Sequence, residues 1–453
     1  MEELLFDLAN RATRYTESLP KRAVSPSQEA VQRLKTLDVP LQDDPIDPAM
    51  VLAELDEIGS PATVATTGGR YFGFVVGGCL PAAMVASMLA AAWDQNVSMR
   101  VLSPVSAHLE DVCRKWLISV LGLPEDAGVG FVTGATMANF SGLAAARHDL
   151  LAGEGWDVEA KGLFGAPPIT VIVSEEAHIS VFKVLGLLGL GRERVLRVPV
   201  DGQGRMRADK LPPISGPTIV CIQAGNVNTG AFDPAEEICR TTRALGAWVH
   251  VDGAFGLWAL ASPKLAHLAK GFQDADSWAM DGHKWLNVPQ DSGIVFVREA
   301  SHLQAAMSAR AAYLIEGEGR EPSHYVPESS RRARGIEIWA ALRSLGRIGL
   351  ADLIERTCQH ASRFAEGLIA AGYDILNDVV LNQVLVSFGG ADITRRVIQR
   401  VQQEGTCWCG GTEWQGHVAM RISVSSWATT EEDVQRSLDV LLRIASQEAE
   451  GQD

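Results

Sequence analysis

The chain has 453 residues, enough for two or three domains and a large core. Hydrophobic residues make up 47% and charged residues 21%, as in an ordinary globular protein. The net charge of −15 argues against a nucleic-acid partner, and no lysine- or arginine-rich run offsets it.

The seven cysteines are an odd number scattered along the chain. They do not form the pattern of a disulfide framework, and they suit a reducing cytosol, so we expect a cytoplasmic protein. Cys407 and Cys409 have no second pair or histidine cluster at zinc-site spacing, and we interpret them as packing residues rather than metal ligands. The N-terminus carries acidic residues early and does not resemble a signal peptide.

The first sixty residues are predicted to be amphipathic helical pieces broken by prolines, an arm (1–60) rather than a domain. The apolar stretch Gly73–Trp93 comes next, and it is long enough to suggest a membrane span. It consists mostly of alanine and glycine, contains Pro81 and ends at Asp94. We therefore expect a loop followed by a buried helix, and no membrane partner.

Seven short apolar runs then alternate with helical segments, which indicates an α/β fold. Their sequences are GVGFVT, PITVIVS, RVLRVPV, PTIVCIQA, AWVHVD, SWAMD and GIVFV. Continuous apolar runs of this length are typical of strands buried on both faces, so we predict a mostly parallel seven-stranded sheet. We assign this sheet to a large domain that spans residues 61–333.

The pattern changes at Arg334, where a long segment of helical period begins. Two strands are predicted at NQVLVSF and VAMRISV, and a last helix at TTEEDVQRSLDVLLRIA, with Thr429 and Glu432 spaced as a capping box. These elements predict a smaller C-terminal α+β domain over residues 334–453.

Polar residues follow four of the predicted strands, where an open parallel sheet binds its ligands. Gly134, Ala135 and Thr136 open a helix after the first strand, and free N–H groups there would hold an anion such as a phosphate. His178, Asp252 and Lys284 follow later strands.

Each of these residues alone has an ordinary structural explanation, such as a helix cap, an ion pair or a lysine that reaches solvent. One cofactor, pyridoxal 5′-phosphate, needs all four features. Its phosphate binds a helix N-terminus, its ring stacks on a flat side chain, its pyridine nitrogen pairs with a carboxylate and its aldehyde forms a Schiff base with a lysine.

The chain resembles the pyridoxal-phosphate-dependent amino-acid decarboxylases of the aromatic-amino-acid/glutamate decarboxylase group, which have the aspartate-aminotransferase fold. The resemblance runs from about Tyr71 to Asp433. The motifs that carry it are YFGFVVGG, AAAWDQN, WLISVLGLP, SEEAHISVFKVLGLLG, GAFDP, HVDGAFG, DGHKWLN and SSWATTEEDV.

The resemblance implies roles for individual residues. Lys284 matches the Schiff-base lysine, Asp252 the carboxylate on the pyridine nitrogen, His178 the residue stacked on the ring and Ala254 the small residue on its other face. The expected cofactor contacts also include Gly134, Ala135, Thr136, Asn226, Asp281 and His283. Tyr325 falls where relatives carry a mobile loop with a catalytic tyrosine, and Arg421 is similar to an arginine that binds the substrate carboxylate. Arg421 is equally well explained as a member of an ordinary ion pair at a sheet edge.

The sequence departs from the family in three places. A second glycine is missing from the phosphate loop, AGNVNTGAFDP replaces a Gly-Thr-Thr stretch, and Asp281 stands where relatives often have asparagine. These differences leave Lys284, Asp252 and His178 in place.

The resemblance implies decarboxylation of an L-amino acid, with an aromatic side chain slightly preferred over acidic or diamino ones, in a homodimer with shared active sites. An aminotransferase or another lyase of the same fold would use the same Lys284–Asp252 pair, and a catalytically silent cofactor-binding protein is a third interpretation.

Overall fold

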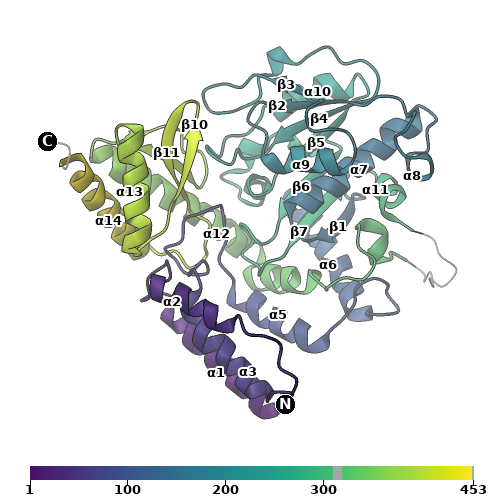
Figure 1. Cartoon of the computed structure of the whole chain (residues 1–453). Helices are drawn as coiled ribbons and strands as arrows, with labels where there is room; N and C mark the ends of the chain where they lie inside the picture. Colours follow the sequence, from purple (N-terminus) through teal and green to yellow (C-terminus); the bar gives the residue numbers. More distant parts are fainter. Residues whose placement is uncertain (310–318, 451–453) are drawn as a thin grey trace. The chain divides into compact units, whose positions relative to one another are not determined.

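A computed structural model describes residues 1–309 and 319–450 (Figure 1). The chain forms two compact units. The first unit comprises residues 1–78, 360–376 and 384–453, and the second comprises residues 79–359 and 377–383. The expected division into residues 1–60, 61–333 and 334–453 remains a prediction.

The second unit is built around a seven-stranded sheet with strand order β1-β7-β6-β5-β4-β2-β3. Only β7 runs antiparallel to its neighbours, so the other six strands share one direction. The strands are β1 (Gly128–Val132), β2 (Thr170–Ser174), β3 (Leu196–Val198), β4 (Thr218–Gln223), β5 (Trp248–Asp252), β6 (Ser277–Asp281) and β7 (Gly293–Val297). All seven predicted strands are present, and the α/β prediction with a mostly parallel sheet is confirmed.

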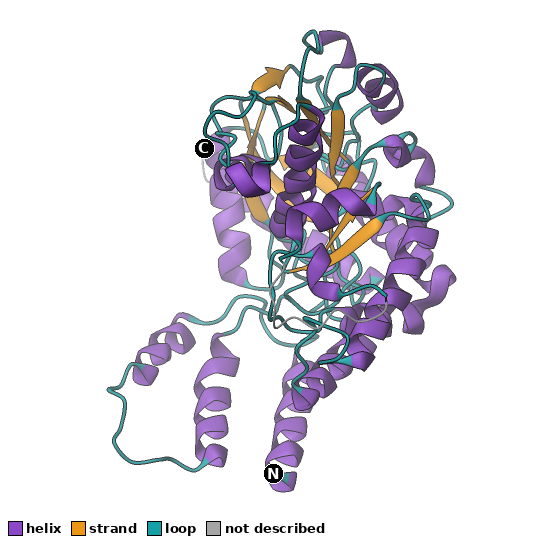
Figure 2. Ribbon diagram, turned by 90° about the vertical axis from the view of Figure 1, so that its right-hand side faces the viewer, coloured by secondary structure: helices purple, strands orange, loops and turns teal. Residues whose placement is uncertain are grey.

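Helices pack on both faces of this sheet, and in Figure 2 the orange strands lie between purple helices. Because the strands are covered on both faces, β1, β4, β5, β6 and β7 are buried at every position. The α-helices are α5 (Pro81–Trp93), α6 (Pro104–Leu121), α7 (Ala135–Gly153), α8 (Val158–Lys161), α9 (Ile179–Leu187), α10 (Ala235–Arg243), α11 (Ala300–Met307) and α12 (Gly335–Ala370). Helix α12 is kinked at Gly346 and continues into the first unit. The 3₁₀ turns are η3 (Ala208–Lys210), η4 (Gly256–Ala261), η5 (Ala266–Ala269), η6 (Phe272–Asp274) and η7 (Pro322–Tyr325).

Helix α5 lies within the apolar stretch Gly73–Trp93, for which the sequence predicted a loop and a buried helix rather than a membrane span. It starts at Pro81 after a loop, as expected, but only Ala83 and Ala90 are buried on it. The expectation of a buried helix was therefore wrong for most of α5 within this chain. An apolar sequence does not distinguish a helix packed in the chain's own core from a helix with an exposed apolar face. No helix in the described ranges is long and apolar enough to cross a membrane.

The first unit combines N-terminal helices with a small sheet of order β10-β11-β9-β8. The N-terminal elements are α1 (Glu2–Ser18), α2 (Gln28–Arg33), η1 (Leu34–Leu37), α3 (Pro48–Glu54), η2 (Leu55–Gly59) and α4 (Ser60–Ala62). The later elements are β8 (Asp374–Ile375), β9 (Gln383–Ser387), α13 (Ala391–Glu404), β10 (Gly410–Trp414), β11 (His417–Ser423) and α14 (Glu431–Glu450).

The start of α14 shows a capping box one residue later than predicted. Thr430 Oγ1 accepts the Asp433 N–H at 3.1 Å, and Asp433 Oδ2 accepts the Thr430 N–H at 3.1 Å. Thr429 instead donates its hydroxyl to the carbonyl of Gly69 at 2.8 Å. Two adjacent threonines precede the acidic run, so spacing alone could not decide between them.

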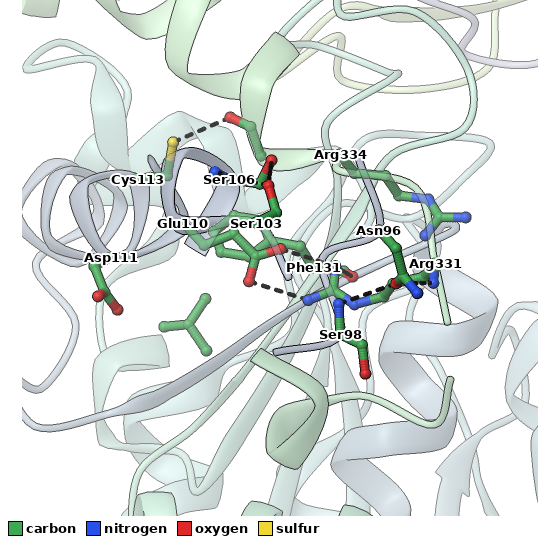
Figure 3. Close-up of polar contacts among 12 residues, drawn as sticks. Asn96, Ser98, Ser103, Ser106, Glu110, Asp111, Cys113, Phe131, Arg331 and Arg334 are labelled. Carbon is green, nitrogen blue, oxygen red and sulfur yellow. Dashed lines mark hydrogen bonds and ion pairs between the residues drawn. The ribbon is translucent and has the colours of Figure 1, made fainter. Parts of the chain in front are cut away.

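A buried ion cluster supports the free edge of β1 (Figure 3). Glu110, on α6, is fully buried, and its carboxylate pairs with Arg331 Nη1 at 2.8 Å and with Arg320 Nη1 at 3.4 Å. The same two arginines donate to carbonyls on the outer edge of β1, Arg331 to Phe131 at 3.2 Å and Arg320 to Val129. The Glu110 carboxylate therefore holds two guanidinium groups, and these donate hydrogen bonds to backbone carbonyls at the edge of β1.

We predict that Glu110→Gln lowers the free energy of unfolding by about 3–5 kcal/mol, because it leaves the buried Arg331 guanidinium without its counter-charge and leaves Arg320 only Asp111, at 3.9 Å. Urea denaturation followed by tryptophan fluorescence measures this loss. Asp111→Asn is the comparison, since Asp111 pairs with Arg100 and, at 3.9 Å, with Arg320 from a side chain that is 25% exposed, and it should cost under about 1 kcal/mol. Equal losses in the two variants would contradict the assignment.

Candidate active site

A cavity of about 360 Å³ opens at the carboxyl edge of the seven-stranded sheet. It is lined by residues that follow β1, β2, β4, β5 and β6. These five strands share one direction, so their carboxyl ends lie at one edge of the sheet. The lining residues are Thr133, Gly134, Ala135, Thr136, His178, Ser180, Gln223, Gly225, Val227, Asp252, Ala254, Phe255, Asp281, His283 and Lys284.

The N-terminus of α7 forms one wall of the cavity. Gly134 is its N-cap, and Ala135 and Thr136 are its first two residues. A methyl group added at Gly134 would lie 3.1 Å from a ring carbon of His283 and 3.3 Å from Asp281 Oδ1, so it would fill the space in front of the helix. The dipole of this 19-residue helix gives its N-terminus a positive potential that suits an anion.

Lys284 and Asp281 form an ion pair beside this helix terminus. Lys284 Nζ lies 3.0 Å from Asp281 Oδ2, and the side chains are 20% and 3% exposed. The other oxygen of Asp281 accepts the N–H of Ala135 at 2.5 Å. The lysine of the HKW motif is therefore neither buried without a partner nor free in solvent. Its amine lies at the cavity wall.

His283 is held in one tautomer by the turn that follows β6. The N–H of Ser292 donates to His283 Nδ1 at 3.1 Å, so this nitrogen carries a lone pair. The proton of the neutral ring is then on Nε2, which lies 3.5 Å from Asp281 Oδ1. His283 therefore presents an N–H donor next to the N-terminus of α7.

Asp252 ends β5 with its carboxylate at the cavity. It is 6% exposed, and within the described chain its carboxylate accepts one long hydrogen bond, from the N–H of Ala254 at 3.4 Å. A buried carboxylate is normally paired or accepts several hydrogen bonds. Asp252 is thus suited to a cationic partner that enters the cavity.

His178 is both a helix cap and a cavity residue. Its Nδ1 accepts the N–H of Ser180 at 3.3 Å, and it is the N-cap of α9. The ring is half-buried and lines the cavity, so one imidazole fixes a helix start and offers a flat surface to a ligand.

A buried polar chain fastens α7 to the sheet behind the cavity. Trp248 Nε1 donates to Ser277 Oγ at 2.8 Å, and Ser277 Oγ lies 2.7 Å from His250 Nδ1. His250 Nε2 contacts Asn139 Oδ1, on α7, at 2.8 Å. Burial lowers the pKa of His250 to about 3, so the ring is neutral.

Two residues expected at the site, Tyr325 and Asn226, are not among the described residues that line the cavity. Tyr325 is 7% exposed in the core, where its hydroxyl accepts from Gln304 Nε2 at 2.7 Å, and it does not line the cavity. Burial of this kind does not fit a residue of a mobile loop, and residues 310–318 lie outside the described part of the chain. Asn226 instead forms a turn, with Oδ1 accepting the N–H groups of Asn228 and Thr229. Arg421 is on β11, in the first unit, where burial lowers its pKa.

The sequence argument missed several cavity residues, among them Gln223, Gly225, Val227 and Phe255. Gln223 ends β4, and its amide Nε2 donates to the carbonyl of Glu176 at 2.9 Å. Listing polar residues after every predicted strand would have found Gln223, whereas glycine and apolar side chains carry no such signal.

Comparisons with known proteins agree with this architecture. The family model "Pyridoxal-dependent decarboxylase conserved domain" matches residues 31–388. The chain belongs to this family.

Among curated relatives, the human acidic amino acid decarboxylase GADL1 is 30% identical over 339 residues, which cover 72% of this chain and 64% of the relative. An aromatic-L-amino-acid decarboxylase of Bacillus atrophaeus is 26% identical over 391 residues, 81% of this chain and 79% of the relative. The chain spans about six tenths of the length of the first curated relatives it matches. The crystal structure of Oryza sativa TDC with PLP and tryptamine matches with a TM-score of 0.90 at 20% identity, covering 98% of this chain and 97% of the other, which shows a shared fold.

We predict that His250 makes stability fall at acid pH. Its pKa is about 3 in the folded chain and about 6.5 when unfolded, so only the unfolded chain binds this proton between those values. Its contribution is complete above about pH 6.5 and is lost toward pH 3, at up to about 1.4 kcal/mol per pH unit. Denaturation of the wild type and of His250→Gln at several pH values tests this, with the exposed His417→Gln as control. An unchanged slope in His250→Gln would refute it.

Proposed function

We propose that this chain is a pyridoxal-5′-phosphate-dependent decarboxylase that converts an L-amino acid into an amine and CO₂. The observation that carries the proposal is that one cavity holds the Lys284 amine, the under-bonded Asp252 carboxylate and the N-terminus of α7. Family membership supports decarboxylation over transamination by the same residues.

The residues present fit the cofactor. The N-terminus of α7 and His283 Nε2 would hold the phosphate, and the space that a side chain at Gly134 would fill leaves room for it. Asp252 would pair with the protonated ring nitrogen, and His178 and Ala254 would lie against the ring. Lys284 would form the covalent link.

The chain's own groups orient the substrate and move its proton. When bound, the cofactor supplies an electron sink for the pair released as the bond between Cα and the carboxylate breaks. Asp252 keeps the ring nitrogen protonated, which deepens that sink. Lys284 Nζ lines the cavity and, when it is not covalently linked, is suited to return a proton to Cα. In this chain the Tyr325 hydroxyl accepts a hydrogen bond from Gln304 Nε2 at 2.7 Å, and its role as a proton donor stays a prediction.

An uncharged, aromatic or apolar side chain is the substrate class that the cavity favours. Among the described lining residues Lys284 is the only lysine or arginine, and the cofactor would use it. Phe255 and Val227 contribute apolar wall, which suits a ring or an alkyl group. Arg421 keeps its proposed role toward the substrate carboxylate.

We also propose a cytoplasmic homodimer. Cys113, Cys221, Cys239, Cys407 and Cys409 are free thiols, as in a reducing compartment. Val85, Met88, Leu89 and Trp93 on α5 are between 39% and 56% exposed. Such an apolar helix face is typical of a subunit interface.

The first test measures cofactor attachment and product together. The wild type with added cofactor should show a visible absorbance band that shifts on adding substrate, and should release CO₂ with an equal amount of amine. Lys284→Ala should lose the band and at least about 10³-fold of the rate, because no covalent link forms. Lys270→Ala, at an exposed lysine outside the cavity, is the control. Full activity in Lys284→Ala, or a keto acid as product, would contradict the proposal.

A screen of the twenty amino acids, ornithine and diaminobutyrate for released CO₂ identifies the substrate class. We expect aromatic amino acids to give the highest kcat/KM. An acidic amino acid as the best substrate would contradict the substrate class that we infer from the cavity lining.

The second test addresses the dimer. Leu89→Asp places a charge on the apolar face of α5 and should convert the dimer into a monomer in light scattering. Leu245→Asp, at an isolated leucine that is 58% exposed, should leave the mass unchanged. A wild-type monomer would rule the dimer out, and a dimeric Leu89→Asp variant would exclude α5 from the interface.

A further inference from the structure

Asp281 occupies the place where an anion would be expected. It ends β6, is 2% exposed and lies against the N-terminus of α7, where Oδ1 accepts the N–H of Ala135 at 2.5 Å. A long helix attracts an anion to its first N–H groups. One of those groups is already used by a carboxylate of the chain itself.

The negative charge of Asp281 is balanced mainly by Lys284, whose Nζ lies 3.0 Å from Oδ2. His283 offers only a neutral N–H, since its Nδ1 accepts from Ser292, and its Nε2 lies 3.5 Å from Oδ1. If the Lys284 amine were bound to an aldehyde, its nitrogen would keep at most one N–H donor instead of three, so its contact with Asp281 would compete with its other contacts. A phosphate at the helix terminus would then lie close to a buried carboxylate of the same sign.

We propose that Asp281 is a positioning residue that lowers the affinity of the α7 terminus for phosphate. It holds the Lys284 amine and the Ala135 N–H in place while no cofactor is bound, and it opposes the cofactor's phosphate when one enters. This inference rests on the proposed function, because it assumes that the cofactor's phosphate binds at α7. A neutral amide at this position would keep a hydrogen-bond acceptor for Ala135 and remove the repulsion.

The experiment compares Asp281→Asn with the wild type, using cofactor-free protein and two probes. Inorganic phosphate, titrated by calorimetry, reports the helix terminus alone. Pyridoxal and pyridoxal 5′-phosphate, titrated by absorbance, differ only in the phosphate. We expect Asp281→Asn to bind inorganic phosphate at least about tenfold more tightly, and the ratio of pyridoxal 5′-phosphate to pyridoxal affinity to rise by a similar factor.

Two further variants keep the outcome interpretable. Asp281→Glu retains the charge and should give no gain, and Asp281→Ser replaces the amide if Asp281→Asn does not fold. Asp233→Asn is the matched control, because Asp233 is also buried and accepts two backbone N–H groups, those of Met206 and Gln223, but lies outside the cavity. It should leave phosphate affinity unchanged.

Equal or weaker phosphate binding by Asp281→Asn, or the same gain in Asp281→Glu, would overturn the inference. Failure of the proposed function is a separate result, namely a wild type that forms no visible band with pyridoxal 5′-phosphate. The phosphate titration needs no catalysis, so the two failures are distinguishable.

Discussion

The shared direction of β1, β2, β4, β5 and β6 is the constraint on which the site depends. A strand that ends at this edge leaves its last side chain and the following turn at the same border of the sheet. Residues as distant in sequence as Gly134 and Lys284 therefore line one cavity. Strand β7 runs the other way, and its first residue, Gly293, is so close to Gly134 that an added methyl group would lie 2.4 Å from the Gly134 Cα. The start of the antiparallel strand thus packs closely against the N-cap of α7.

Several buried carboxylates in the described part of this unit are balanced by the chain itself, whereas Asp252 points to a ligand. Glu110 is paired with two arginines. Asp233 accepts two backbone N–H groups, although burial still raises its pKa to about 6. Asp281 accepts the N–H of Ala135 at the start of α7 and forms an ion pair with Lys284. Asp252 accepts only one long hydrogen bond within the described residues, so its desolvation is offset only when a cation binds.

The sequence predicted the elements and residues whose signals are local. Strands β1, β4, β5, β6 and β7 are mostly apolar runs because both of their faces are covered, and the polar residues after the predicted strands are visible as interruptions. Strands β8 and β10 were missed, since β8 has two residues and β10 begins with two glycines. The burial of Tyr325 depends on Gln304 and on Arg320, whose guanidinium lies 4.2 Å from the ring centre, and no local pattern encodes such packing.

Two buried polar networks fix the wall that would receive a phosphate. On β1, before the turn, Arg320 and Arg331 hold the backbone carbonyls of Val129 and Phe131. On α7, after the turn, Asn139 is held by the neutral His250. A turn anchored on both sides cannot move far to avoid an unfavourable neighbour. If this wall receives a phosphate as proposed, its anion affinity is set by the charges placed beside it, and the choice between aspartate and asparagine at position 281 changes that affinity directly.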